Sequence, residues 1–139
     1  MLRNLHWLAL VLVVLALSFD FAVWGGAARL PDVGPLLLRS AQREAPIVRF
    51  YMFVGQPLDA LLPAFDRFGQ RHATEAFSEG FQRIKDEPAI AMDLVFSNTW
   101  NSTHASIKTV FWATPALALL WLVLWLRRPK KVNLMSRRR

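Results

Sequence analysis

Two long apolar stretches lie near the two ends of this chain, at residues 5–24 and 110–126, with a more polar segment between them. A helix rises about 1.5 Å per residue, so about 20 apolar residues span the roughly 30 Å hydrocarbon core of a bilayer. The sequence therefore predicts a mainly α-helical membrane protein whose two spans form a helical hairpin. We expect the segment between the spans to be a small α-helical domain outside the cytoplasm.

The hairpin divides the chain into successive segments. We expect a cytoplasmic N-terminus at residues 1–4, transmembrane helix 1 at 5–24, an extracytoplasmic helical domain at 25–101, a helix containing span 2 at 102–126, and a basic cytoplasmic tail at 127–139. A cleavable signal peptide is the alternative for the first stretch, because small residues follow it at 25–28. The length of the apolar stretch and the flanking Trp7 and Trp24 favour a retained span.

The formal net charge of +7 belongs to the regions beside the spans. Basic and acidic residues balance between positions 25 and 109, and most of the excess lies in the tail, which includes Arg127, Arg128, Lys130 and Lys131. Basic residues beside a span stay preferentially on the cytoplasmic side. This predicts a cell-membrane protein, in a bacterium an inner-membrane protein, with both termini cytoplasmic. Attraction of the tail to anionic lipid accounts for its charge, and we expect no nucleic-acid partner.

Asp20 is the acidic residue of the predicted spans and requires a partner there. An unpaired carboxylate is costly within a membrane. In an antiparallel hairpin, Lys108 at the outer end of the second span lies at a similar depth, so we predict that Asp20 and Lys108 form an intramembrane ion pair that fixes the register. The alternative is that Asp20 is wetted at the interface while Lys108 extends toward the headgroups.

Two sets of residues are predicted to contact other proteins. Ser18, Ala22 and Gly26 recur every fourth residue and form a small-residue face suited to close helix packing, unless this spacing arose by chance. The outer segment is too small to bury all its phenylalanines well, which predicts an exposed aromatic binding face. The residues assigned to that face are Phe50, Phe53, Phe65, Phe68, Phe77 and Phe81.

Proline residues divide the outer segment into short helices. Apolar residues recur at helical spacing over residues 63–85, and a shorter helix is expected to restart at Pro88. The apolar run at 47–54 is too short to span a bilayer. A buried strand, a core helix and an interfacial helix all fit this run, and we favour a helix packed on the bilayer or on a partner protein.

The sequence contains few candidates for catalytic or metal-binding residues. It contains no cysteine, which excludes disulfides, thiolate metal sites and thiol catalysis. His72, Glu75 and Glu79 share one helix face, but helical di-iron sites need such a motif twice and this chain has one copy. We interpret them as a solvated face with ion pairs to Arg71 and Arg83. We expect no catalytic residue, no cofactor and no metal.

The expected function is that of an accessory, assembly or scaffold subunit of a larger membrane protein complex. Its expected partners are membrane lipids and either a larger complex or further copies of the chain. Two alternatives remain open: a membrane-permeabilising or lysis protein of the holin kind, and a metal-binding membrane enzyme that uses His72, Glu75 and Glu79.

Overall fold

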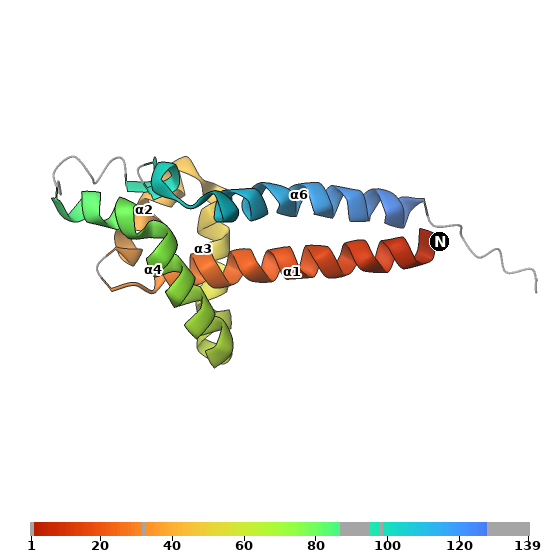
Figure 1. The fold of residues 1–139 in the computed structure, drawn as a ribbon, viewed down its shortest axis with the longest axis horizontal. Helices are drawn as coiled ribbons and strands as arrows, with labels where there is room; N and C mark the ends of the chain where they lie inside the picture. Colours follow the sequence, from red (N-terminus) through yellow and green to blue (C-terminus); the bar gives the residue numbers. More distant parts are fainter. Residues whose placement is uncertain (1, 32, 87–94, 98, 128–139) are drawn as a thin grey trace, which may run out of the picture.

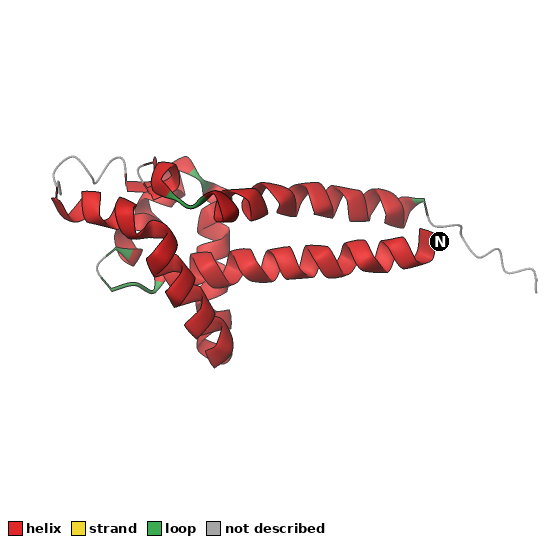
Figure 2. Ribbon diagram, in the orientation of Figure 1, coloured by secondary structure: helices red, strands yellow, loops and turns green. Residues whose placement is uncertain are grey.

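The computed structural model describes residues 2–31, 33–86, 95–97 and 99–127, and its regular elements in these ranges are all helices (Figure 2). They are α1 (Leu2–Ala28), α2 (Gly34–Glu44), α3 (Pro46–Leu61), α4 (Pro63–Asp86) and α6 (Ala105–Leu126). The described residues between 95 and 102 are also helical. The prediction of an all-helical fold is confirmed for these ranges. The expected restart at Pro88 lies outside them.

α1 and α6 lie side by side and form a long stalk, while α2, α3 and α4 gather around one end of it as a head (Figure 1). α1 is the central element, because it packs against α2, α3, α4 and α6. Both α1 from Asn4 and α6 are long and apolar enough to cross a membrane.

α1 continues four residues past the predicted end of the first span, through Gly25 and Gly26 to Ala28. All of residues 22–28 are buried, because α3 and α4 pack against this last part of the helix. If the helix ended with the predicted span at residue 24, Gly25 and Gly26 would lie in a loop. They are helical in the structure, where α3 and α4 pack against them.

α6 begins later than the sequence predicts, at Ala105 instead of residue 102. The helical segment before it ends at Ser102, and the hydroxyl of the next residue, Thr103, donates to the carbonyl oxygen of Thr99 at 2.6 Å. The N–H of Thr103 also bonds the carbonyl of Trp100 at 3.2 Å, which closes a turn. His104 then serves as the N-cap residue of α6.

The predicted helices at 47–54 and 63–85 correspond to α3 and α4, which are separated by the single residue Leu62. α3 continues through Pro57, and the break falls at Leu62, which has φ −121° and ψ 95°. A residue before proline is disfavoured in the helical conformation. Pro63 then begins α4, where a missing N–H costs nothing.

The core of the head is built around Trp24, which is fully buried. The centroid of its ring lies 5.0 Å from that of Phe77 in α4 and 6.2 Å from that of Trp100. Leu37 of α2 and Met52 of α3 are also fully buried in this core. Side chains from α2, α3 and α4 thus pack around the C-terminal end of α1.

Candidate functional site

α1 crosses α3 and α4 at pairs of glycines. A Cβ added at Gly25 would lie 2.6 Å from the carbonyl carbon of Gly55, and one added at Gly69 would overlap the carbonyl oxygen of Ala22. Gly26 faces Gly69 equally closely. The predicted small-residue face is therefore used within the chain itself, since α4 covers Ala22 and Gly26. The sequence pattern alone did not identify Gly55 and Gly69 as the partners of this face. Each is a glycine inside a helical pattern, and that was the signal that could have indicated them.

Asp20 is fully buried between α1 and α6, and its partner is Thr114. The Thr114 hydroxyl donates to Asp20 Oδ2 at 2.6 Å. Lys108 lies closer to the head, where its Nζ donates to the carbonyl of Asn101 at 3.2 Å and sits 5.9 Å from the centroid of the Trp100 ring. The predicted pair of Asp20 with Lys108 is therefore wrong, and so is a wetted Asp20. Lys108 falls in the first turn of α6, within reach of a backbone carbonyl of the head, while Thr114 lies at the level of Asp20.

Replacing Thr114 with valine should lower the free energy of unfolding by about 1–3 kcal/mol. Valine has nearly the same shape but leaves a buried carboxylate oxygen of Asp20 without its hydrogen bond. Denaturant unfolding in detergent micelles measures the change, with Thr114→Ser as the control that keeps the hydroxyl. A Thr114→Val protein as stable as the parent would show that this hydrogen bond contributes no net stability.

A second carboxylate, that of Asp59 in α3, is buried beside the crossing of α1 and α3. It is 1% exposed, and neither of its oxygens has a hydrogen-bond partner among the described residues. A Cβ at Gly25 would lie 2.7 Å from Asp59 Oδ2. Burial, with a further contribution from the charge of Asp66, raises the pKa of Asp59 from 3.8 to about 6. Arg29 lowers this pKa, but its guanidinium also pairs with Asp66 at 3.2 Å.

Asp59 should make the protein less stable as the pH rises from about 4 to about 6. In this window the folded protein keeps a proton on Asp59, whose pKa is raised to about 6, and the unfolded chain releases it. The loss amounts to at most about 3 kcal/mol and is complete above about pH 6. Asp59→Asn should remove it and be the more stable protein at neutral pH. Unfolding free energies measured against pH test this, and parallel curves for the two proteins would contradict it.

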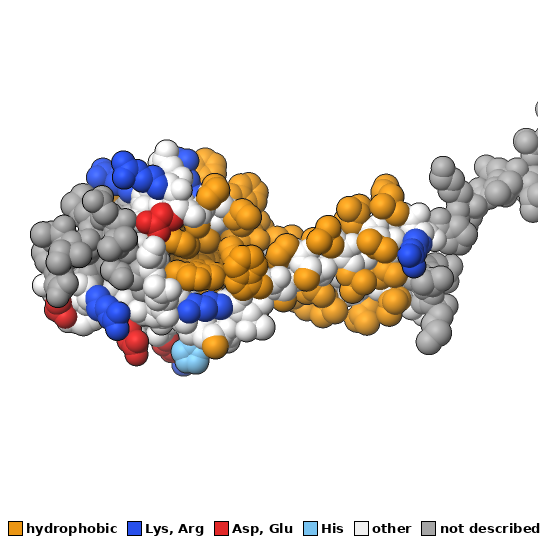
Figure 3. All heavy atoms as spheres, turned by 90° about the horizontal axis from the view of Figure 1, so that it is seen from above, with side chains coloured by type: hydrophobic (Ala, Val, Ile, Leu, Met, Phe, Trp, Pro, Cys, Tyr) orange, Lys and Arg blue, Asp and Glu red, His pale blue; other side chains and the backbone are white. Residues whose placement is uncertain are grey.

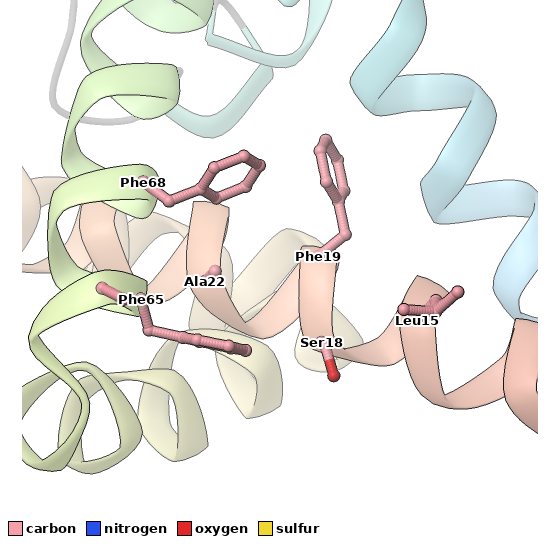
Figure 4. A pocket seen from close by; sticks show the side chains of 7 residues that line it. Leu15, Ser18, Phe19, Ala22, Phe65 and Phe68 are labelled. Atoms are coloured by element: carbon pink, nitrogen blue, oxygen red, sulfur yellow. The ribbon is translucent and has the colours of Figure 1, made fainter.

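An apolar cleft of about 370 Å³ lies between α1 and the first half of α4 (Figure 4). Its lining residues are Leu15, Ser18, Phe19, Ala22, Ala64, Phe65 and Phe68. In Figure 4, the rings of Phe65 and Phe68 extend from α4 over the stretch of α1 that carries Ser18 and Ala22. The structure thus brings together residues that the sequence assigned to two separate interaction sets. Leu15 extends this surface along the stalk and is 61% exposed.

The rest of the predicted aromatic face divides between surface and core. Phe50 and Phe53 are exposed on α3, as predicted. Phe77 and Phe81 are buried, so their assignment to the binding face is wrong. Both belong to the core that surrounds Trp24, where the centroids of their own rings lie 5.8 Å apart.

His72, Glu75 and Glu79 lie on the outer side of α4. The closest approach of the first two is 3.9 Å, from His72 Nδ1 to Glu75 Oε2, while Arg71 Nε pairs with Glu75 Oε1 at 3.2 Å. Within the part of the chain that the structure describes, no group of three or more histidine, cysteine or acidic side chains is placed to bind a metal ion.

The surface of the stalk is apolar, whereas charged side chains gather on the head (Figure 3). No family model, curated protein or solved structure matches this chain. Of the predicted basic tail, Arg127 is exposed at the end of α6, and Arg128, Lys130 and Lys131 lie outside the described residues. The candidate functional features are therefore the apolar cleft, the two buried carboxylates and the exposed face of α3.

Proposed function

We propose that this chain is an accessory subunit that helps to assemble or scaffold a larger membrane protein complex. In this proposal α1 and α6 both span the membrane, both ends of the hairpin are cytoplasmic and the head lies outside, in a bacterial inner membrane. The basic residues that begin at Arg127 support this orientation.

The exposure of α6 supports its placement in lipid. Only Ile107 and Thr114 of this helix are buried, and its large apolar side chains point outward along most of its length. Trp112 is 66% exposed and Leu119 is 63% exposed. A contiguous apolar surface of this extent is unfavourable in water and is typical of a surface covered by membrane or by a partner.

The observation that carries the proposed function is the apolar cleft between α1 and α4. At the junction of head and stalk, α1 and α4 leave an open apolar surface between them. Ser18 of α1 is small enough to allow another backbone to approach closely, and aromatic walls such as Phe65 and Phe68 are common anchors of protein interfaces. We therefore assign the cleft to a transmembrane helix of a partner protein.

Site-specific photocrosslinking tests this assignment. A benzophenone amino acid at position 18 or 68 is expressed in the full chain at its native level, and crosslinked products are purified in mild detergent and identified by mass spectrometry. Position 79, on the outer side of α4, is the matched control. We expect crosslinks to a larger membrane protein from the cleft positions and none from position 79.

Two other outcomes would contradict the accessory role. Crosslinks only to further copies of the chain, in large homo-oligomers, would favour the membrane-permeabilising alternative. Crosslinks to lipid alone would show that the cleft faces the bilayer and has no protein occupant.

Filling the cleft should release the partner. Ser18→Phe places a large side chain in the space between α1 and α4, and we expect it to reduce co-purification of the partner about tenfold or more. Ser78→Phe on the exposed side of α4 is the control of equal chemistry. Equal loss of partner in both variants, or in neither, would contradict a role of the cleft.

A further inference from the structure

α3 has one buried side and one uncovered apolar side. Its buried residues are Val48, Tyr51, Met52, Gly55 and Asp59, which face the core and α1. On the other side, Ile47, Phe50, Phe53 and Leu61 are all exposed, and Phe53 reaches 73%. Such an amphipathic helix, with aromatic residues on its open side, needs an apolar environment to cover it.

Ring contacts show that this uncovered side faces along the stalk. The ring of Phe50 packs edge-on against Phe21 of α1 at 6.1 Å, one helical turn before α3 crosses α1 at Gly25. Ile47 shares a cleft with Phe111 and Trp112 of α6. The apolar side of α3 is therefore continuous with the apolar surface of the two candidate spans, and Figure 3 shows this surface passing from the stalk onto the head.

The direction of α3 matches the plane of a membrane. α3 runs across the stalk instead of along it, at the level where the stalk enters the head (Figure 1). If α1 and α6 cross a bilayer, α3 lies parallel to its surface, at the outer end of the spans. The height of its uncovered side then coincides with the boundary between acyl chains and headgroups.

Arginines border the apolar side of α3. Arg49 lines a cleft of about 320 Å³ together with Gln42, Pro46, Phe50 and Phe53. Arg39 and Arg43, one turn apart on α2, are exposed as well. The neighbouring acid Glu44 accepts a hydrogen bond from the hydroxyl of Ser97 at 2.6 Å. Arg49 therefore places a positive charge at the edge of the apolar side, and the preceding helix α2 carries two further exposed arginines, which together favour an anionic surface.

We propose that α3 lies in the headgroup region of the bilayer and binds anionic phospholipid. Phe50 and Phe53 insert among the acyl chains, while Arg49, with Arg39 and Arg43 behind it, contacts lipid phosphates. Amphipathic helices with basic borders bind anionic membranes in this way. The inference rests on the proposed placement of α1 and α6 as spans, but not on the partner of the cleft. It would fix the head against the membrane and hold the cleft at a constant depth.

Spin-label accessibility tests the position of α3. The sequence contains no cysteine, so single cysteines can be labelled with a nitroxide in the full chain. The protein is reconstituted in phosphatidylcholine vesicles with and without phosphatidylglycerol. Collision rates with oxygen, which enriches in lipid, and with a water-soluble nickel chelate are measured at position 53. Position 119 on the stalk is the lipid control, and position 82 on the exposed side of α4 is the water control.

We expect Phe53→Cys to resemble position 119, with high oxygen and low nickel accessibility. Resemblance to position 82 would overturn the proposal, because α3 would then face water. Shielding from both reagents would also overturn it, because a protein would then cover α3. Accessibility of position 119 to nickel would show that α6 does not lie in lipid, and the proposed spans would then fail together with this inference. A failure of the α3 proposal alone would leave position 119 inaccessible to nickel.

The anionic preference has its own test. Quenching of a fluorophore at position 53 by spin-labelled phosphatidylglycerol is compared with quenching by spin-labelled phosphatidylcholine. We expect Arg49→Gln to reduce the preference for the anionic lipid about fivefold, as for one basic residue at a membrane surface. Arg83→Gln on α4 should leave it unchanged. An unaltered preference in Arg49→Gln, or an equal loss in Arg83→Gln, would contradict the proposed binding of anionic lipid by Arg49.

Discussion

Replacing Gly69 with alanine should destabilise the folded protein by about 3 kcal/mol or more, although alanine is the better helix former by about 1 kcal/mol. The added Cβ would overlap the backbone carbonyl of Ala22, and no change of rotamer can remove a clash between a Cβ and a backbone. α4 would have to move away from α1, which would also disturb the contact of Gly26 with Gly69. Denaturant unfolding of the purified protein measures the effect.

Ser78→Ala is the control. Ser78 lies in the same helix and is exposed, so this change introduces alanine into α4 without placing an atom against α1. We expect it to cost much less than Gly69→Ala. A Gly69→Ala protein that gains stability, as an open helical glycine would, shows that α1 and α4 do not cross as closely as described.

Three helices of this fold could be predicted from local patterns. Periodic apolar residues located α4, and continuous apolarity located α1 and α6, whereas the apolar run in α3 also fitted a strand and α2 was not predicted. The ends of the helices could not be predicted, because they depend on contacts between distant segments. Gly25 and Gly26 stay helical only because α3 and α4 enclose them, and α6 starts at Ala105 because Thr103 closes the preceding turn.

The sequence identified residues of the candidate site more readily than it identified which of them contact one another. The sequence identified Ser18, Ala22, Phe65 and Phe68, but only the crossing at Gly69 shows that they line one cleft. The expected depth of Lys108 in a hairpin made it the predicted partner of Asp20, but in the structure Thr114 lies beside Asp20 instead. Lys108 was the expected partner because its charge is opposite to that of Asp20. Thr114 is uncharged and lies in an apolar helix, so the sequence indicated it only weakly.

The largest single loss of stability is expected from Trp24→Ala, at about 3–5 kcal/mol. From the sequence alone, Trp24 is interpreted as an anchor at the membrane interface, in the same role as Trp7. In the structure it is fully buried, and its ring stacks on Trp100 with an interplanar angle of 15° while Phe77 packs beside it. Its removal would leave a cavity at the point where α1, α4 and the segment before α6 meet.

Trp112→Ala distinguishes these two roles of a tryptophan. Trp112 is 66% exposed on α6, so its loss should change the unfolding free energy by much less than the loss of Trp24. If both are interface anchors, the two substitutions should have similar, small effects on stability. If Trp24 organises the core, only Trp24→Ala should unfold the head, and the cleft formed by α4 should lose its partner with it. A comparison of unfolding and photocrosslinking in the two variants therefore tests whether the head folds around the end of α1.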